Sequence, residues 1–251
     1  MRDRLRTDYD RIAGLYDIDR AKWVIRADKV VAALVAEGRR NIRVLDVGCG
    51  TCLYLRAQRE HFAGEPVKWI GVDASTQMLA NAADKEPDLE IARARAEALP
   101  VLADAIDYVY SSFAFHHFTD KEGALDEIAR VLGKGGRLRI RNMDPWGQRR
   151  WWLYEFFGGA WEADQVRFWP AERIRAALEQ RGFDVEAEVE IEQVSRTAND
   201  ALDEAERRVI SQLSILDDES YEAGITRLRA LPPEEPIDYP RAGLTLDARK
   251  R

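Results

Sequence analysis

The sequence predicts an α/β fold in which helices cover both faces of a mostly parallel sheet. Two observations support this prediction. Short apolar runs, typical of strands, alternate with amphipathic stretches that are long enough for crossover helices. The first of these runs ends in a glycine-containing turn, which is where such sheets bind ligands. The 251 residues suffice for one large α/β domain or for a domain with a lid.

The composition is that of a folded protein and disfavours several kinds of partner. A net charge of -7 repels phosphate backbones, so we expect no nucleic-acid substrate. Both cysteines lie in one turn, which implies no disulfide framework and suits a reducing cytoplasm. The first ten residues are charged and contain no apolar run, so we expect neither a signal peptide nor stable membrane insertion. The oligomeric state stays open.

The first half of the chain contains the alternating elements. Apolar residues recur at helical spacing over residues 24–35 and stop before Gly38, which predicts an N-terminal helix. Helices are also expected at residues 51–60, 75–83 and 121–132, the last closed by Gly133 and by Gly135-Gly136. The expected strands cover residues 42–47, 67–72, 89–92, 106–111 and 137–141.

The pattern changes after residue 141. Five of the seven tryptophans lie between residues 146 and 169, so we expect no simple sheet element there. The remaining elements are a helix at 170–181, a strand at 183–191, helices at 199–216 and 218–231, and a last strand at 243–248.

The turn after the first strand begins with Asp46 and contains Gly48 and Gly50. Such a turn places backbone N–H groups at a helix N-terminus, which serves several cofactors equally well. Leu53 stands where a dinucleotide site would have its third small residue, so a pyrophosphate fits less well. The Asp46 carboxylate would repel a pyrophosphate but could accept hydrogen bonds from an ammonium group. An amino-acid-like cofactor is therefore favoured.

A second acidic residue ends the second strand. Asp73 follows Gly50 by 23 residues, close to the spacing at which a carboxylate holds both ribose hydroxyls. Asp73 could alternatively serve only as the N-cap of the following helix, although Ser75 can cap that helix itself.

Several segments, in order and spacing, match a known family. They are 9–17 (YDRIAGLYD), 44–51 (VLDVGCGT), 71–79 (GVDASTQML), 96–100 (AEALP), 111–117 (SSFAFHH) and 132–137 (LGKGGR). Together they resemble the class I S-adenosylmethionine-dependent methyltransferases, and in particular the branch with the ubiquinone and menaquinone biosynthesis methyltransferases. The resemblance is dense over residues 9–141 and thinner afterwards.

The resemblance implies a Rossmann-like three-layer sandwich, with seven strands of which the last is antiparallel. It implies one methyltransferase domain over residues 1–251, with helical lid elements at about 1–37, 144–168 and 199–231. The cofactor would be S-adenosylmethionine, with S-adenosylhomocysteine as product. The implied cofactor-binding residues are Tyr16, Asp46, Gly48, Cys49, Gly50, Asp73, Ala74, Met78, Ala96, Glu97 and Ser111. Many relatives have an aspartate before Ala96, but this chain has Arg95, which cannot accept a hydrogen bond from adenine.

Two histidines are the candidate catalytic residues. His116 and His117 follow the fourth strand, near the expected methyl group, and histidine is the usual general base near neutral pH. His117 is the stronger candidate, although either residue could simply pack between strand and helix. We expect no metal, because the third histidine, His61, is remote in sequence and the cysteines lie in the cofactor turn.

Arg141 and Trp146 are the candidate substrate-binding residues. Arg141 is the last of three arginines that alternate along the fifth strand, and an arginine at this end would suit an acidic acceptor. Salt bridges to acidic helices would explain the arginines equally well. Trp146 opens the tryptophan-rich segment, which could be the wall of an apolar pocket, ordinary core or a patch that touches membrane.

The predicted function is methyl transfer to an O, N or C atom of a small apolar or acidic metabolite. A non-catalytic or regulatory protein that binds S-adenosylmethionine is the main alternative. An NAD-dependent oxidoreductase is disfavoured by Asp46 and Leu53, and methylation of protein or RNA by the acidic charge.

Overall fold

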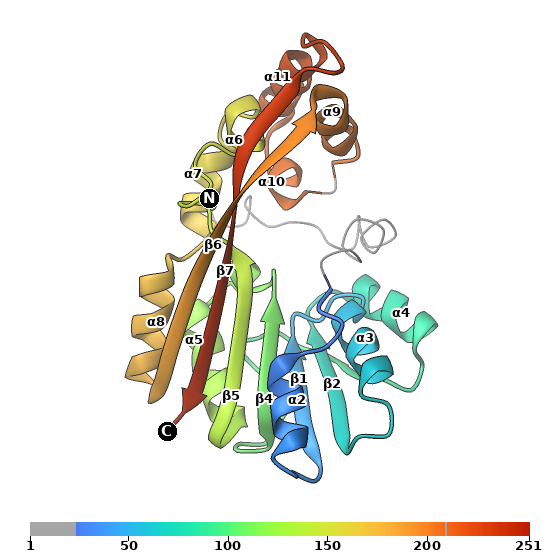
Figure 1. Cartoon of the computed structure of the whole chain (residues 1–251), viewed down its shortest axis with the longest axis vertical. Helices are drawn as coiled ribbons and strands as arrows, with labels where there is room; N and C mark the ends of the chain where they lie inside the picture. Colours follow the sequence, from blue (N-terminus) through green and yellow to red (C-terminus); the bar gives the residue numbers. More distant parts are fainter. Residues whose placement is uncertain (1–23, 209) are drawn as a thin grey trace. The chain divides into compact units, whose positions relative to one another are not determined.

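The computed structural model describes residues 24–208 and 210–251 and contains one seven-stranded sheet. The strand order is β3-β2-β1-β4-β5-β7-β6 (Figure 1). β1 pairs in parallel with β2 and β4, and the parallel pairing continues to β3 and β5. β7 runs opposite to its neighbours. The prediction of a Rossmann-like α/β fold with an antiparallel last strand is therefore confirmed. The strands are β1 (Ile42–Val47), β2 (Val67–Asp73), β3 (Glu90–Arg93), β4 (Ile106–Ser112), β5 (Leu132–Met143), β6 (Phe183–Thr197) and β7 (Pro236–Lys250).

The described residues form two compact units. The sheet unit contains residues 24–142, 172–187 and 245–251, and the helical unit contains residues 143–171 and 188–244. β6 and β7 contribute one end to each unit. The expected lid elements 144–168 and 199–231 both fall within the helical unit.

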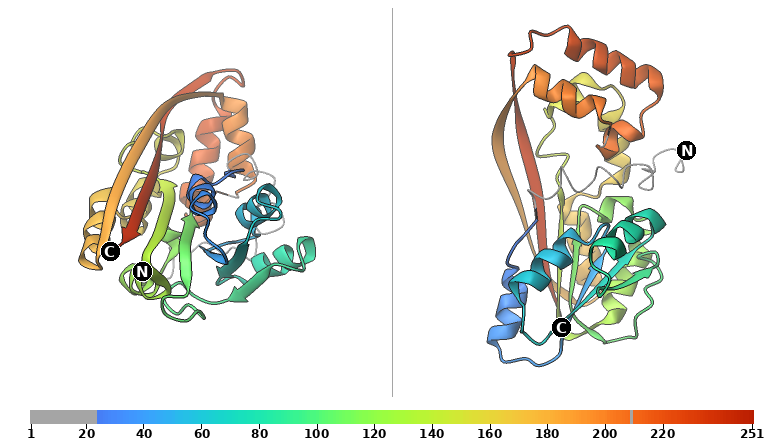
Figure 2. Two further views of the ribbon diagram at one scale, coloured as in Figure 1. Left: turned by 60° about the horizontal axis from the view of Figure 1, so that its bottom comes forward. Right: turned by 90° about the vertical axis from the view of Figure 1, so that its right-hand side faces the viewer.

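Helices cover both faces of the sheet unit. α2 (Lys29–Ala36) and α3 (Leu53–His61) lie on one face, whereas α5 (Lys121–Val131) and α8 (Ala171–Gln180) lie on the other (Figures 1 and 2). α4 (Thr76–Lys85) follows β2. The α2/α3 face packs on β1, β2 and β4 through a core that includes Val31, Leu34, Val44, Leu55, Trp69 and Tyr108.

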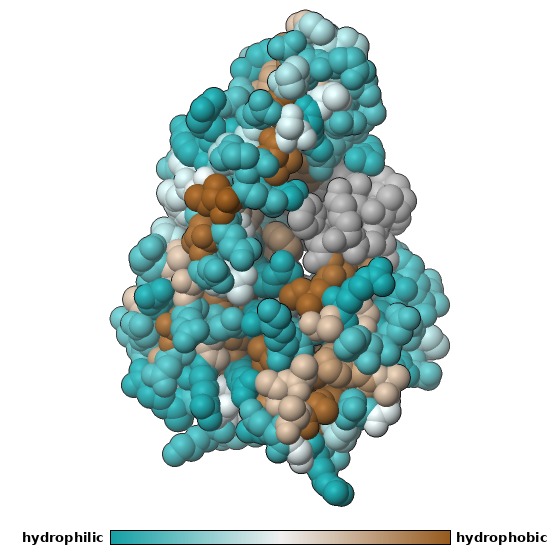
Figure 3. Space-filling model, in the orientation of Figure 1, coloured by the Kyte–Doolittle hydropathy of each residue, from teal (hydrophilic) through white to brown (hydrophobic). Residues whose placement is uncertain are grey.

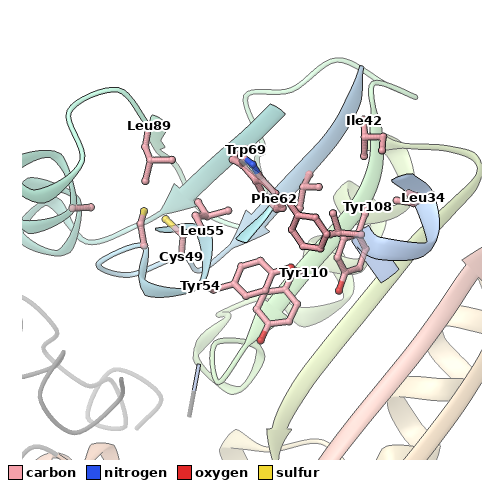
Figure 4. Close-up of a cluster of buried hydrophobic side chains, with 14 of the residues drawn as sticks. Leu34, Ile42, Cys49, Tyr54, Leu55, Phe62, Trp69, Leu89, Tyr108 and Tyr110 are labelled. Atoms are coloured by element: carbon pink, nitrogen blue, oxygen red, sulfur yellow. The ribbon is translucent and has the colours of Figure 1, made fainter. Parts of the chain in front are cut away.

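A buried carboxylate organises this core. Asp28 is completely buried at the N-cap of α2, where it accepts a hydrogen bond from Val30 N. Its Oδ2 atom also accepts hydrogen bonds of 2.9 Å from the hydroxyls of Tyr54 and Tyr108. The Tyr54 ring stacks on the Tyr110 ring (Figure 4), and their centroids are 3.7 Å apart. The network links α2 and α3 to β4.

The helical unit has its own apolar core. Its helices are α6 (Trp152–Phe156), α7 (Ala160–Arg167), α9 (Ala198–Glu206), α10 (Ser211–Ser214) and α11 (Asp218–Arg229). Trp152 and Phe157 are buried, and a Cβ on Gly224 would lie 2.2 Å from the Phe157 ring, so only glycine allows this contact between α11 and Phe157. The prediction that the tryptophan-rich segment is not a simple sheet element is confirmed.

Three predicted helices were wrong in extent. Residues 199–216 form α9 and α10 instead of one helix, because Arg208 adopts a left-handed backbone with φ of +49° that ends the first helix. The helix predicted at 51–60 begins at Leu53, since Cys52 is also left-handed and serves as its N-cap. Val24 and Ile25 precede α2 instead of lying within it, because Asp28 caps the helix.

Three strands are several residues longer than predicted, namely β5, β6 and β7, and β6 continues to Thr197. α5 ends at Val131, and the expected closing glycines lie inside β5, where Gly135 has a φ of +74°. β7 begins at Pro236 although prolines usually end strands. Asp144 N donates to Ala242 O, so residues 236–241 extend past the end of β5, where a missing proline N–H is tolerated.

The visible face in Figure 3 is mostly hydrophilic. Among residues 24–208 and 210–251, no helix combines the length and the apolarity that crossing a bilayer requires. The large apolar side chains that stay exposed are Leu102, Trp146, Val166, Val189 and Ile191.

Candidate functional site

The candidate site lies where the direction of strand order reverses. β2 and β3 follow β1 to one side, whereas β4 and β5 lie on its other side. Ligands of open α/β sheets bind at such a switch point, outside the carboxyl ends of the strands. Asp46 pairs with Gly71 on β2 and with Tyr110 on β4, so the turn that follows begins at this point.

Backbone hydrogen bonds fix the turn after β1. Gly48 N and Cys49 N both donate to Val72 O, at 2.8 and 3.1 Å. Gly50 N donates to the Asp73 carboxylate at 2.8 Å. The N–H groups of these three turn residues are therefore already used within the protein.

Glycine is required at two places around this turn. Gly48 has a φ of +79°, and a Cβ there would lie 2.4 Å from the Cβ of Ala114. A Cβ on Gly71 would lie 2.9 Å from the Cys49 sulfur. Both distances are too short for real carbon neighbours, so the turn packs directly on the backbone of β2 and on the segment after β4.

Two carboxylates flank the turn. Asp46 is 3% exposed, and burial, followed by the charge of Asp73, raises its pKa well above the ordinary value. A cation placed between two such carboxylates would stabilise the ionised form of both. An anion at the same place would destabilise both ionised carboxylates. The pair therefore fits the ammonium or sulfonium of a cationic cofactor and does not fit a diphosphate.

Asp73 does more than cap a helix. Its Oδ1 atom accepts a 2.8 Å hydrogen bond from Ser75 N, while its Oδ2 atom holds Gly50 N. Ser75 itself is the N-cap of α4, through a hydrogen bond from Met78 N. The prediction that Ser75 caps this helix is confirmed. Ala94 N donates to the backbone carbonyl of Asp73, which places the start of the loop after β3 beside the end of β2.

That loop contains Ala96, which is buried, and Glu97, which is half-buried. The Glu97 carboxylate accepts a 2.8 Å hydrogen bond from Asp120 N and pairs with Arg95 at 3.4 Å. Although burial opposes it, these interactions lower the pKa of Glu97. Arg95 therefore orients Glu97. Of the other two residues predicted on this side, Met78 is buried and Ala74 is exposed.

The end of β4 contributes a strained turn with two histidines. Ser111 Oγ donates to Val47 O at 2.8 Å and so ties β4 to β1. Phe113 has a φ of +52°, which is strained for an aromatic residue and typical of functional sites. His116 and His117 follow in a short 3-10 helix, with ring centroids 3.8 Å apart. His116 is buried, whereas His117 is half-buried.

Lys121 holds this histidine turn in place. Its ammonium donates to His116 O at 3.3 Å and to Phe118 O at 3.0 Å. These two carbonyls lie at the end of the 3-10 helix, where a cation is favourable.

The three arginines of β5 have different partners. Arg137 pairs with Glu37, and Arg139 lies 2.6 Å from Asp247 and 3.7 Å from Asp28. Salt bridging therefore explains both. Arg141 instead hydrogen bonds the Tyr110 hydroxyl, and its buried Nη1 atom has no hydrogen-bond partner within residues 24–208 and 210–251.

The strand ends of the sheet unit bring together most of the predicted site residues. Trp146 is 38% exposed and belongs to the helical unit, and Tyr16 lies outside the described residues. Within the described part of the chain, no group of three or more histidine, cysteine or acidic side chains could hold a metal.

Sequence reasoning missed three residues at the site. The pairing of Tyr110 with Asp46 in the strand register could have been inferred by counting residues in β4. The roles of Phe113 and Lys121 had no such signal, because a positive φ at phenylalanine and a lysine that binds carbonyls follow no local pattern.

Known methyltransferases are similar to this chain in sequence. Residues 45–140 match the methyltransferase domain family model. Malonyl-[acyl-carrier protein] O-methyltransferase of Alcanivorax borkumensis is 39% identical over 135 residues, which cover 53% of this chain and 45% of that protein. Demethylmenaquinone methyltransferase of Chlorobaculum parvum is 33% identical over 142 residues, covering 54% and 58%. The matches thus span about half the length of these curated relatives.

A solved structure shows the same fold. The YcgJ protein of Bacillus subtilis superposes with a TM-score of 0.58 at 22% sequence identity, covering 88% of this chain and 97% of that one. In its strand order, in the motifs at its strand ends and in the domain matched over residues 45–140, this chain is similar to the class I S-adenosylmethionine-dependent methyltransferases, and in particular to the branch with the ubiquinone and menaquinone enzymes.

Proposed function

We propose that this chain binds S-adenosylmethionine at the turn after β1 and transfers its methyl group to a small acceptor with an acidic group. The observation that best supports the cofactor is the pair of carboxylates, Asp46 and Asp73, around a turn whose N–H groups are already used. A diphosphate would meet two negative charges and few free donors. NAD is therefore a poor fit, whereas the ammonium of the methionyl group suits Asp46.

The proposed cofactor contacts are those that the resemblance to the methyltransferases implies. Gly48, Cys49 and Gly50 would contact the methionyl part, and Asp73 with Ala74 would hold the ribose. Met78, Ala96 and Glu97 would surround the adenine, with Arg95 keeping Glu97 oriented. Ser111 and Tyr16 would complete the pocket.

Arg141 would bind the acidic group of the acceptor. Its Nη1 atom is buried without a partner among the described residues, and a buried guanidinium donor gains free energy when a carboxylate or phosphate accepts from it. The Tyr110 hydroxyl lies beside this guanidinium and would help to orient it. The role of Trp146 in binding the acceptor stays a prediction from the sequence, because Trp146 belongs to the helical unit.

The bound cofactor supplies an activated methyl group, so the protein mainly has to position the acceptor. His117 would accept a proton where the accepting O, N or C atom must lose one. Lys121 fixes the backbone of this turn and thereby the position of the imidazole.

Calorimetric titration of the protein with S-adenosylhomocysteine and with NAD tests the cofactor. We expect binding of S-adenosylhomocysteine alone, and binding of NAD alone would contradict the proposal. Cell extract incubated with a radioactive methyl donor and then sorted by size tests the acceptor. Label in the small, anionic fraction is expected, whereas label in protein or RNA would contradict a small acceptor. Binding without any labelled product would favour a regulatory protein.

Arg141→Met tests the acidic acceptor, with Arg137→Met as its matched control on the same face of β5. The first variant should reduce labelling of the anionic product about tenfold or more, since it loses a charge-assisted hydrogen bond, and should leave S-adenosylhomocysteine affinity unchanged. The control loses only the pair with Glu37 and should keep both properties. Equal activity of both variants would contradict the role of Arg141.

A further inference from the structure

The two cysteines of the chain form an isolated pair. Cys49 and Cys52 are both free thiols and both buried. The sequence contains two cysteines in total, so no other intramolecular disulfide is possible.

The backbone holds these cysteines at the separation that a disulfide needs. Cys52 N donates to Cys49 O at 2.8 Å, which closes a β-turn over residues 49–52. The Cα atoms at the ends of a β-turn lie within about 7 Å, and disulfides join Cα atoms about 4.4–6.8 Å apart. The two side chains belong to the same buried cluster, so the thiols lie on the same side of the turn. Closing the bond therefore requires side-chain rotation but little backbone movement.

The Cys52 side chain is buried in the core beside Cys49, although its backbone conformation is unfavourable for a cysteine. Its φ of +60° is a conformation that glycine adopts freely and that strains other residues by about 1–2 kcal/mol. It is the N-cap of α3, yet its side chain makes no capping hydrogen bond. The strain is therefore not explained by packing of the helix end.

We propose that Cys49 and Cys52 are a redox-sensitive dithiol that closes to a disulfide and weakens cofactor binding. The oxidant would be a low-molecular-weight disulfide such as oxidised glutathione. One cysteine thiolate attacks it and releases one glutathione thiol. The second cysteine then attacks the mixed disulfide and releases the other. Two protein thiols are oxidised to one S–S bond, and one external disulfide is reduced to two thiols.

We expect the two cysteines to be reduced unless an oxidising condition persists. The hydrogen bond to Cys52, followed by burial, raises the pKa of the Cys49 thiol, so few thiolates exist at neutral pH and oxidation is slow. A transient stress would leave most of the protein reduced, while a sustained oxidising condition would close the bond.

The effect on binding rests on the proposed function of the turn. Bond formation brings the sulfurs to about 2.05 Å, which requires the Cys49 side chain to rotate next to β2, where even a Cβ on Gly71 would lie only 2.9 Å from its sulfur. Gly50 lies between the cysteines and donates to Asp73, the proposed ribose ligand. Disturbing this hydrogen bond to a charged group should weaken S-adenosylhomocysteine binding about tenfold.

The first experiment measures the disulfide itself, independently of any cofactor. The folded protein is equilibrated in a series of glutathione redox buffers, its thiols are trapped by alkylation after denaturation, and the intact mass is measured. We expect loss of both thiols together in wild type. Cys52→Gly, whose glycine suits the backbone at this position, should give only a mixed disulfide with glutathione. Two reactive thiols in wild type after the most oxidising buffer would overturn the proposal.

The second experiment measures the coupling to binding. S-adenosylhomocysteine should bind the reduced wild type and Cys52→Gly equally, and oxidised wild type about tenfold more weakly. By thermodynamic linkage, saturating cofactor should raise the reduction potential of the pair by about 30 mV for that tenfold difference. A disulfide that forms without changing either affinity or potential would overturn the regulatory role. Absence of binding to the reduced protein would contradict the proposed function and leave the disulfide measurement standing.

Discussion

The contact between Gly48 and Ala114 allows a quantitative test of how the cofactor turn is built. In Gly48→Ala, the new Cβ would lie 2.4 Å from the Ala114 Cβ, at a backbone φ of +79°. The left-handed backbone should cost about 1–2 kcal/mol and the overpacking about 1–3 kcal/mol. The variant should therefore lose about 2–5 kcal/mol of unfolding free energy.

Ala114→Gly separates these two contributions, because it removes the atom that clashes. Alone it should cost about 1–2 kcal/mol, through a lost buried methyl group and a more flexible chain. In the double variant the overpacking disappears while the backbone strain remains. The double variant should therefore lose about 1–3 kcal/mol less unfolding free energy than the sum of the losses in the two single variants.

Urea unfolding of the four proteins in the double-mutant cycle measures this coupling energy. The dependence of the free energy on urea should stay the same, which shows that the unfolding transition itself is unchanged. S-adenosylhomocysteine affinity, measured in parallel, should fall in Gly48→Ala and recover in part in the double variant. Strictly additive free energies would refute the reasoning, since they would mean that the turn and the segment after β4 are not in contact.

Three further substitutions test other parts of the site. Asp73→Asn should weaken S-adenosylhomocysteine binding about tenfold by calorimetry, because a neutral amide is a weaker acceptor for ribose hydroxyls; unchanged affinity would remove Asp73 from the ribose site. Because the pKa of Asp46 is raised in the folded protein, the fold is favoured when this carboxyl is protonated. The free energy of unfolding therefore falls as pH rises through the raised pKa. Asp46→Asn should therefore raise the melting temperature of the cofactor-free protein at pH 7, with a smaller gain towards pH 4, and a pH-independent difference would contradict this. Tyr108→Phe removes a hydrogen bond to the buried Asp28 and should cost about 1.5–3 kcal/mol in urea unfolding, and a cost near zero would show that Asp28 does not depend on it.

Local sequence patterns predicted the first half of the fold well. β1 begins and ends where its apolar run does, and Ser75 caps α4 as its residue type suggests. These features depend on residues close together in sequence, so periodicity and capping preferences suffice. The breaks that were missed, at Arg208 and at Cys52, are left-handed residues other than glycine, and no short-range pattern specifies them.

The sequence predicted which residues lie at the site better than it predicted which residues they pair with. Asp46 and Asp73 are recognisable from their positions at strand ends. The difference between Arg141 and the other two arginines of β5 is not, because the partners Glu37 and Asp247 come from opposite ends of the sequence. Only the folded chain shows which of the three arginines keeps a buried donor without a partner among residues 24–208 and 210–251.

The strand order also has a consequence for biosynthesis. β7 lies between β5 and β6 although it follows every other strand in the sequence. While the ribosome is still making β7, β6 has no neighbour, and an unpaired strand readily joins strands of other molecules. Acidic side chains alternate along β6, at Asp184, Glu186, Glu188, Glu190 and Glu192. Their mutual repulsion would keep nascent copies of this strand apart until the matching strand emerges.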